Sequence, residues 1–307
     1  MQLSMDPAGS GPCGAAAGPG TPTWLVTPGI VPTRFATAVA SGAAVVLLDL
    51  EDSVPAKAKA NARTEVLAFA ARRSADGAGP LLGVRINAAD STEGLRDIAA
   101  MSEWDLWPDL IVVPKVESSG DIEAVTRTVR GAHPATKIWA LIESPRAIVG
   151  LSDIVHAPGL AGVLFGAADY AAAAGSRITS RAMWYPRCQI ITAAAAAGIP
   201  AIDSPFFSLD APDALRTEAV EAVELGFAGK VAVHPHQLPV IEEAFAPSPS
   251  ELEAARAVLA AADRAGGGIT MVDGAMVGPP LVAAARAVVR RGDRSTTATT
   301  TSLVKAS

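Results

Sequence analysis

Acidic side chains stand directly after two apolar runs of this chain, where they could hold a cation. Glu143 follows the run IWALI, and Asp169 closes the segment GVLFGAAD. If the two runs are neighbouring strands, both carboxylates can reach one Mg²⁺ ion, which takes one or two protein carboxylates and fills its other positions with water and substrate oxygens. Alternatively, each acid caps the helix that follows it. The spacing leaves both interpretations open.

An arginine ends a third apolar run. Arg85 lies in VRINA, where a guanidinium is costly to bury unless it faces an anion. That anion is either a substrate carboxylate or enolate oxygen, or the side chains of Glu51 and Asp52 after the preceding run, and both pairings can hold at once. Asp52 or Ser53 could also simply cap the helix expected to open at Pro55.

Further candidates fall into two sets. The basic residues Arg34, Lys57, Lys59 and Arg63 could bind phosphate, or they could be solvated surface charges. Other polar residues at the ends of apolar runs are Asp49, Asn87, Lys115, Glu117, Asp203, His234 and Gln237. The chain has only four histidines and no His-Glu-x-x-His arrangement, so a zinc site is not expected.

The elements that must position these residues alternate between short apolar runs and amphipathic helical segments, which is typical of βα units on a parallel sheet. Eight strands are expected, at Trp24–Thr27, Val45–Leu50, Leu81–Ile86, Leu110–Val113, Ile138–Ile142, Gly162–Phe165, Pro200–Ile202 and Val231–Val233. This number favours a closed (β/α)₈ TIM barrel, whose active face is formed by the loops after the strands. An open doubly wound sheet is the alternative, but no G-x-G-x-x-G follows the first strand.

Composition excludes several classes of protein. The 307 residues are 50% hydrophobic and carry a net charge of −6, so the chain can bury a large core and lacks the basic surface that nucleic acid needs. Two cysteines cannot build a disulfide framework, and no apolar run reaches the ~18 residues that a membrane span requires. We therefore expect a cytoplasmic protein with no nucleic-acid or membrane partner.

The chain is expected to divide into four parts. Residues 1–21, rich in Gly, Pro and Ala, and the Thr-rich residues 294–307 are expected to be disordered tails. Residues 22–247 are expected to form the catalytic barrel. Residues 248–293 exceed what eight βα units need, and we expect a C-terminal extension of helix, turn and helix that packs on a neighbouring subunit.

Eight motifs in order give the chain a resemblance to a known family. They are LVTPGIVPTRF, LLDLEDSVPAKAKANAR, VRINA, VVPKVES, ALIESPRA, GAADYAA, AIDSPF and GFAGKVAVHPHQ. With these motifs the chain resembles the HpcH/HpaI aldolase superfamily, most closely its citrate lyase β-subunit-like branch, from about Trp24 to Arg291.

The resemblance implies a Mg²⁺-dependent barrel, usually a homotrimer or hexamer. Such an enzyme makes or breaks the carbon–carbon bond of a β-hydroxyacyl thioester, CoA-bound or carrier-bound, with an acyl thioester and a 2-keto acid on the other side of the reaction. Citryl-CoA, malyl-CoA and citramalyl-CoA are examples of such substrates. By motif, Glu143 and Asp169 match the metal ligands and Arg85 matches the residue that binds the thioester oxygen.

Further site residues are expected from the same motifs. Catalytic roles are expected for Glu51 and Asp52 beside Arg85, and contacts to the substrate or CoA for Arg34, Lys57, Arg63, Pro28 and Gly29. The acyl group and the direction of the reaction are not encoded in any motif.

Two positions depart from the family pattern. Relatives carry an Asp near the C-terminus that reaches a neighbouring subunit's site as the acid/base group, and here GAMVGPP places Gly278 at that position. Ala168 stands where several relatives have Glu. Since glycine transfers no proton, two alternatives stay open beside the lyase. They are an acyl-CoA thioesterase or other reaction on the same scaffold, and a non-catalytic protein that binds acyl thioesters.

Overall fold

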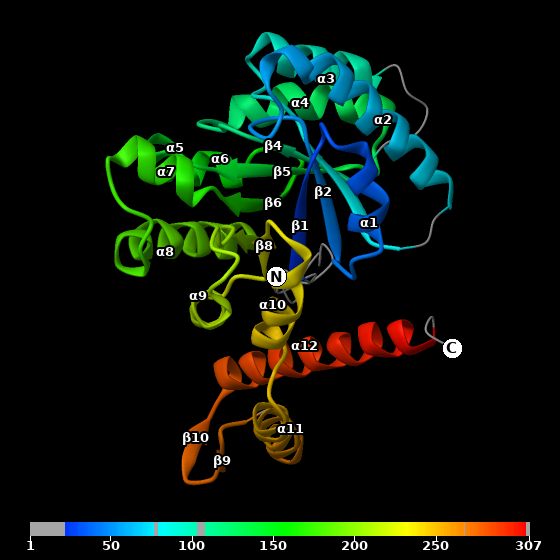
Figure 1. Ribbon diagram of the computed structural model, residues 1–307. Coiled ribbons are helices and arrows are strands. Elements are labelled where there is room, and N and C mark those ends of the chain that lie inside the picture. Colours follow the sequence, from blue (N-terminus) through cyan, green and yellow to red (C-terminus); the bar gives the residue numbers. More distant parts are fainter. Residues whose placement is uncertain (1–21, 77–78, 103–107, 267, 305–307) are drawn as a thin grey trace, which may run out of the picture. The chain divides into compact units, whose positions relative to one another are not determined.

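The computed structural model of the chain describes residues 22–76, 79–102, 108–266 and 268–304 (Figure 1). Parallel strands pair in chain order and close into a barrel. They are β1 (Thr23–Pro28), β2 (Val45–Asp49), β3 (Leu81–Arg85), β4 (Leu110–Val113), β5 (Lys137–Ile142), β6 (Leu160–Phe165), β7 (Ala201–Asp203) and β8 (Gly229–Ala232). Because β8 pairs with β1 through Trp24 and Val231, the expected (β/α)₈ barrel is confirmed and the open sheet is wrong.

Helices connect the strands, and several carry the end signals that their sequences predict. In the barrel the helices are η1 (Pro32–Arg34), α1 (Phe35–Val39), η2 (Ala56–Ala58), α2 (Lys59–Asp76), α3 (Thr92–Ser102), α4 (Ser119–Ala132), α5 (Pro145–Val149), α6 (Leu151–Val155), α7 (Ala167–Ala174), α8 (Ser180–Ala197), α9 (Pro212–Leu225) and η3 (Pro235–Gln237). The Thr179 hydroxyl accepts from the Ala182 N–H at the start of α8, and Gly198 ends that helix in the left-handed conformation.

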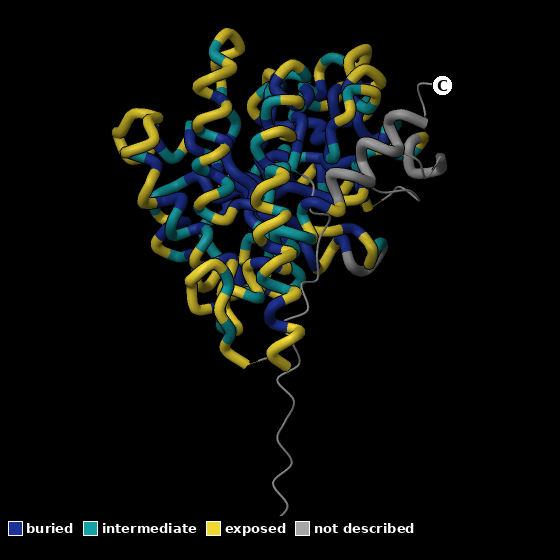
Figure 2. The backbone as a smooth tube through the Cα atoms, turned by 90° about the horizontal axis from the view of Figure 1, so that it is seen from below, coloured by how far each residue is buried: buried dark blue, intermediate teal, exposed yellow. Residues whose placement is uncertain are grey.

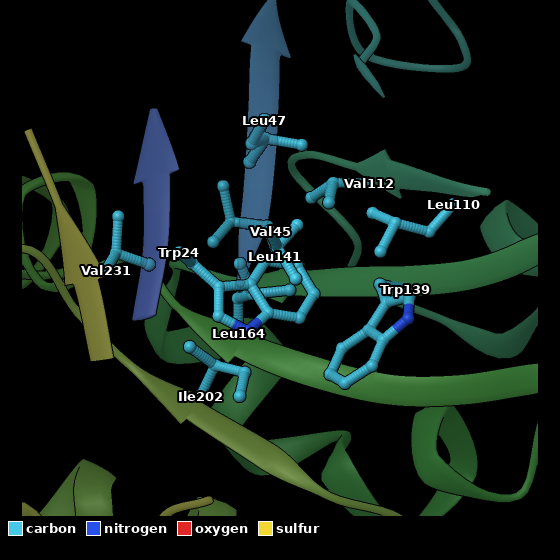
Figure 3. Close-up of a cluster of buried hydrophobic side chains, with 10 residues drawn as sticks. All are labelled: Trp24, Val45, Leu47, Leu110, Val112, Trp139, Leu141, Leu164, Ile202 and Val231. Carbon is cyan, nitrogen blue, oxygen red and sulfur yellow. The ribbon is translucent and has the colours of Figure 1, made fainter. Parts of the chain in front are cut away.

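The barrel interior is filled by side chains of the strands (Figure 3), and in β3 Leu81 packs against this core while Gly83 leaves room for Leu47 and Leu110. Trp24 and Trp139 meet edge to face, with ring centroids 4.7 Å apart. Buried stretches, dark blue in Figure 2, follow these strands. The core is therefore packed with side chains and is not a pore.

Alternation along the strands explains which polar residues face the barrel axis. Val45 and Leu47 point into the core, so Asp49 continues the same inward row at the end of β2. Trp139 and Leu141 likewise precede Glu143 in the inward row of β5. The inward rows thus change from apolar to charged at the carboxyl ends of the strands.

Asp203, at the end of β7, points away from the barrel axis, because side chains along a strand alternate between its two faces. Its neighbour Ile202 belongs to the core, so the Asp203 side chain points outward and is fully buried beneath α8 and α9. There it pairs with Arg187 of α8 at 3.1 Å and with Lys230 of β8 at 2.7 Å. Asp203, a candidate by its place after an apolar run, therefore belongs to a structural ion pair between the strands and helices.

The described residues divide into two compact units, one ending at Leu238 and one beginning at Pro239. The second contains most of α10 (Leu238–Phe245), α11 (Pro249–Arg264), β9 (Thr270–Val272), β10 (Ala275–Val277) and α12 (Pro279–Val304). This boundary precedes the expected one at residue 247, because α10 groups with the C-terminal elements. None of the helices in the described ranges is long and apolar enough to span a membrane.

Two expectations about the C-terminal residues need correction. The helix α12 continues to Val304, whereas a disordered tail was expected from residue 294; low helix propensity of threonine is a weak effect once a helix is propagating. The expected turn is a hairpin of β9 and β10 that reverses at Asp273 and Gly274, both with positive φ. An Asp-Gly pair between apolar residues is a strong hairpin signal, so the sequence contained this information. The tail expected at 1–21 lies outside the described residues.

Close packing behind Trp139 gives a test of the core. A Cβ at Gly162 would lie 2.3 Å from the Trp139 ring, so we expect Gly162→Ala to lower the free energy of unfolding by about 1–3 kcal/mol through overpacking. Urea denaturation measures this change. Gly120→Ala in the exposed first turn of α4 is the matched control, where a Cβ meets only the Ser118 hydroxyl at 3.6 Å and the expected gain is up to about 1 kcal/mol. Equal stability of the two variants would contradict the packing described.

Candidate active site

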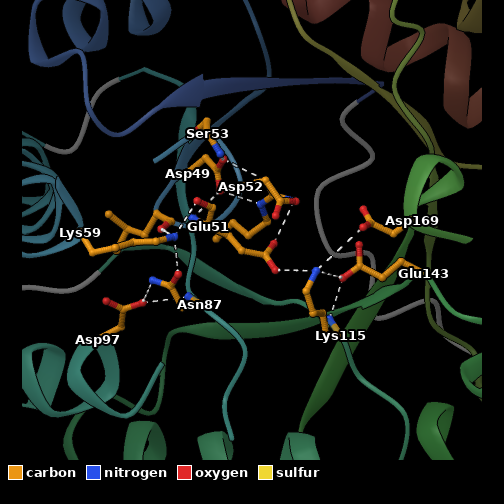
Figure 4. A network of polar contacts seen from close by, with 12 residues as sticks. Asp49, Glu51, Asp52, Ser53, Lys59, Asn87, Asp97, Lys115, Glu143 and Asp169 are labelled. Atoms are coloured by element: carbon orange, nitrogen blue, oxygen red, sulfur yellow. Dashed lines mark hydrogen bonds and ion pairs between the residues drawn. The ribbon is translucent and has the colours of Figure 1, made fainter. Parts of the chain in front are cut away.

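Charged side chains from β2, β3, β4, β5 and α7 gather at the carboxyl end of the barrel (Figure 4). Asp49 and Arg85 are register partners on adjacent strands, and their side chains form a two-point ion pair with distances of 2.6 and 2.8 Å. Although burial raises it, the net pKa of Asp49 is lowered by the hydrogen bond and charge of Arg85. Asp49 therefore holds the guanidinium in one orientation.

The remaining nitrogen of Arg85 faces the next two acids. Nη1 lies 3.1 Å from Glu51 Oε2 and 3.5 Å from Asp52 Oδ2. The expected pairing of Arg85 with Glu51 and Asp52 is thus present, and Asp49 is a third partner whose role the sequence did not reveal. The Asp52 side chain is 56% exposed, so the edge of this cluster is open to solvent.

Lys115, in the loop after β4, links this cluster to the two expected metal ligands (Figure 4). Its Nζ lies 3.0 Å from Glu51, 3.9 Å from Glu143 and 4.0 Å from Asp169. Burial lowers the pKa of Lys115, but the hydrogen bond to Glu51 and the charges of Glu143 and Glu51 raise it by more, so the net pKa is above its usual value. The side chain is a permanent cation among three carboxylates.

Glu143 has a strongly raised pKa. Burial, the charge of Glu51 and that of Asp169 raise its pKa to about 8, against the charge and backbone N–H of Lys115. The Lys115 N–H donates to Oε1 at 2.7 Å, while Oε2 is buried with no hydrogen-bond partner among the described residues. Gly166 packs behind this carboxylate, where a Cβ would lie 2.8 Å from Oε2. The carboxylate is held in place with one oxygen unsatisfied.

These residues fit a magnesium ion better than a metal that needs many protein ligands. Within the described ranges, no three His, Cys, Asp or Glu side chains converge at metal-binding spacing. Mg²⁺ needs one or two carboxylates and keeps several waters, so Glu143 and the half-exposed Asp169 suffice. The unsatisfied Oε2 of Glu143 is the observation that a bound cation would explain.

Four of the residues expected to bind substrate or CoA follow β1 and β2 at this end of the barrel. Pro28 ends β1, and the Gly29 N–H donates to the Asp49 carbonyl at 2.9 Å. A Cβ at Gly29 would lie 2.5 Å from that carbonyl oxygen, so this close approach requires glycine. Arg34 in η1 and Lys57 in η2 are exposed, which leaves both cations available to an anion.

Arg63 differs from these, because its guanidinium already has partners. It is buried in α2 and pairs with Asp97 at 2.6 Å and with Glu93 at 2.6 Å. A role in phosphate binding would require breaking both pairs, so the geometry favours a structural role for Arg63.

A buried chain of hydrogen bonds runs from the same Asp97 to the site (Figure 4). Asp97 accepts from the backbone and side-chain nitrogens of Asn87 at 2.8 and 2.7 Å. The side-chain oxygen Oδ1 of Asn87 accepts from Lys59 Nζ, which also donates to the backbone carbonyls of Leu50 and Glu51 at 2.8 and 2.7 Å. Sequence reasoning considered Lys59 for phosphate binding, whereas it fixes the loop that carries Glu51.

Comparison with known proteins gives consistent matches. The family model described as HpcH/HpaI aldolase/citrate lyase matches residues 23–235. The (3S)-malyl-CoA thioesterase of Cereibacter sphaeroides is 32% identical over 82% of this chain and 88% of its own length. The L-malyl-CoA/β-methylmalyl-CoA lyase of Rhodobacter capsulatus is 30% identical over 88% of this chain and 93% of its own length.

A solved structure matches equally well. CitE from Mycobacterium tuberculosis, in complex with magnesium, acetoacetate and coenzyme A, superposes with a TM-score of 0.74 and 32% identity, covering 89% of this chain and 98% of that one. The same barrel therefore accommodates a magnesium ion and a CoA-related ligand in a relative.

The raised pKa of Glu143 predicts that metal binding releases a proton. Near pH 7 most of the apoprotein carries Glu143 protonated, since its pKa is about 8, so we expect the release of about one proton per Mg²⁺ ion and much less near pH 9. Calorimetric titrations in two buffers of different ionisation enthalpy measure this number. Binding at pH 7 without proton release would contradict the assignment.

The same pKa shift predicts the pH dependence of stability. An acid whose pKa is raised in the folded state stabilises the fold below its unfolded value of 4.5, and this contribution is lost as the pH rises through about 8. We therefore expect the metal-free protein to lose thermal stability over this interval, and Glu143→Gln to flatten that dependence. Melting temperatures of the metal-free protein and of Glu143→Gln between pH 4.5 and about pH 8 measure this dependence.

Proposed function

Because the chain belongs to the HpcH/HpaI aldolase/citrate lyase family, we propose that it cleaves the carbon–carbon bond of a β-hydroxyacyl-CoA in a Mg²⁺-dependent reaction. The products are an acyl-CoA and a 2-keto acid. The expected family is confirmed by these matches, and so is the expected class of enzyme, a carbon–carbon lyase. The observation that carries the proposal is the buried Glu143 carboxylate, with one unsatisfied oxygen, beside Asp169 and the oriented Arg85.

Glu143 and Asp169 are the residues that would hold the ion. Bound Mg²⁺ supplies positive charge that stabilises negative charge on the hydroxyl and carboxylate oxygens of the substrate. The Lys115 N–H keeps Glu143 Oε1 in place, and the absence of a side chain at Gly166 leaves room for Oε2.

Arg85 acts on the other half of the substrate. When the carbon–carbon bond breaks, its electron pair moves onto the thioester and forms an enolate, which then takes a proton. Asp49 fixes two nitrogens of Arg85 and leaves Nη1 directed at Glu51 and Asp52. This nitrogen is placed to stabilise the enolate oxygen, an interaction that strengthens as negative charge develops.

Hydrolysis of the thioester is the second candidate, and two observations favour it. A malyl-CoA thioesterase is among the relatives, and Gly278 stands where the family resemblance places the acid/base Asp. Hydrolysis needs an activated water and no carbon–carbon cleavage, so the same metal and arginine could serve it. A non-catalytic thioester-binding protein would keep the fold but would not need the unsatisfied carboxylate.

The finer expectations stay predictions within this proposal. They are a citryl-, malyl- or citramalyl-like acyl group, a carrier-bound thioester as substrate, a trimeric or hexameric assembly, and a cytoplasmic location. The exposed Arg34 and Lys57 are proposed contacts for the CoA phosphates, and Pro28 and Gly29 are proposed to line the path of the thioester.

Removal of one ligand tests the proposed reaction. We expect Glu143→Ala to abolish Mg²⁺ binding in calorimetry and to lower kcat by about 10³-fold or more, because the charge stabilisation is lost. Glu117→Gln is the control, since Glu117 lies after β4 and pairs with Arg146 rather than with the ligands. With malyl-CoA as substrate, the lyase yields acetyl-CoA and glyoxylate. Release of free CoA and intact malate instead would establish the thioesterase.

Restoring the missing acid tests the role of position 278. A Cβ at Gly278 meets its nearest atoms, on Ile269 and Pro280, at 4.0 Å, so a side chain fits. If this position acts as the resemblance implies, Gly278→Asp raises the kcat for carbon–carbon cleavage by about 10²-fold or more, and the isosteric Gly278→Asn does not. The rate of keto-acid formation measures the effect. Equal rates for both variants and the parent would show that the chain uses another acid.

A further inference from the structure

Lys115 places its positively charged ammonium close to the two expected metal ligands, where it would repel a bound cation. Lys115 Nζ lies within 4.0 Å of carboxylate oxygens of Glu51, Glu143 and Asp169 (Figure 4). Negative charge that develops on these acids is mutually repulsive, and the ammonium offsets that repulsion. In the described structure Lys115 is therefore the shared counter-ion of the site.

The backbone of Lys115 is part of the same arrangement. Its φ of +54° lies in the left-handed region, which is unusual for a residue other than glycine. This conformation lets the Lys115 N–H donate to Glu143 Oε1 while the side chain extends toward Glu51. A strained backbone that aims two groups of one residue at the same cluster is typical of a functional position.

A metal ion and the ammonium would compete for the same charge. An ion about 2.1 Å from the carboxylate oxygens of Glu143 and Asp169 would lie within about 6 Å of the present Nζ position. At that distance, in a partly buried site, repulsion between the two cations changes binding by a factor of ten or more. The ammonium can withdraw, because the Lys115 side chain is 46% exposed and Glu51 lies on its far side from the ligands at 3.0 Å.

We propose that Lys115 is a positioning residue that sets the Mg²⁺ affinity of the site. Its ammonium offsets the negative charge of the acidic cluster when no ion is bound, and it gives up its approach to Glu143 and Asp169 and keeps only Glu51 when the ion enters. The cost of this move weakens Mg²⁺ binding, and the same charge stabilises the metal-free protein. The inference rests on the proposed function only in taking Glu143 and Asp169 as the ligands.

Calorimetric Mg²⁺ titration of the full chain tests the inference by the sign of the change. We expect Lys115→Gln to bind Mg²⁺ about tenfold more tightly, and Lys115→Arg, which keeps the charge, to stay within about threefold of the parent. A lysine with a merely structural role would give weaker binding when replaced. Unchanged or weaker binding by Lys115→Gln, in a folded protein, would overturn the inference.

The melting temperature of the metal-free protein is the second readout. Lys115→Gln is expected to melt below the parent without metal, because the acidic cluster loses its counter-ion, and the difference is expected to shrink at saturating Mg²⁺. Equal melting temperatures without metal would count against the counter-ion role.

A further variant covers the case in which Lys115→Gln does not fold. Glu51→Gln removes the place to which the ammonium withdraws, and we expect it to weaken Mg²⁺ binding about tenfold. Mg²⁺ binding by Glu51→Gln that equals or exceeds that of the parent would overturn the inference.

Failure of the two proposals can be told apart. If the parent protein binds no Mg²⁺, the proposed function fails and the inference fails with it. If the parent binds Mg²⁺ and Glu143→Gln does not, while Lys115→Gln binds no more tightly than the parent, the function stands and the inference alone is wrong.

Discussion

The structure of the site depends on one electrostatic constraint, the burial of several carboxylates at the mouth of an apolar barrel. Glu51 and Glu143 have side chains only 6% and 3% exposed, and Asp49 is fully buried. Ionised acids at such positions are tolerated only where cations or hydrogen-bond donors compensate them. Arg85 and Lys115 provide that compensation, one for Asp49 and the other across the site.

The two cations, Arg85 and Lys115, differ in how firmly their side chains are held. Two hydrogen bonds hold the planar guanidinium of Arg85 against Asp49. Its nitrogen Nη1 is therefore a donor in a fixed position beside Glu51. Lys115 is half exposed on a flexible stem and faces three acids at once. A rigid donor suits a substrate oxygen that must be met in one geometry, whereas a mobile ammonium suits a site whose charge changes when an ion enters.

Much of this could be predicted from the sequence, for reasons visible in particular residues. The strands were found because buried parallel strands are continuous apolar runs, and Glu143, Asp169 and Arg85 were found because they follow such runs. Asp203 also follows one, but the alternation from Ile202 places it outside the barrel, and counting residues from the core would have shown this. The two acidic partners of Arg63 and the Asn87 partner of Lys59 could not be predicted, since they lie 28 to 34 positions away and only the packing of the folded barrel brings them close.

The hydrogen bonds that lead from Asp97 to the loop of Glu51 have a consequence for how such a protein can change. Asp97 sits on a helix of the outer layer and touches no acid of the mouth, yet the carbonyls of Leu50 and Glu51 keep their place through Asn87 and Lys59. Engineering aimed at new substrates would ordinarily vary residues near the ligand and leave the helices alone. Here the geometry of the candidate site depends in part on a residue of the outer helices, so position 97 belongs among those to hold constant when the loops are diversified.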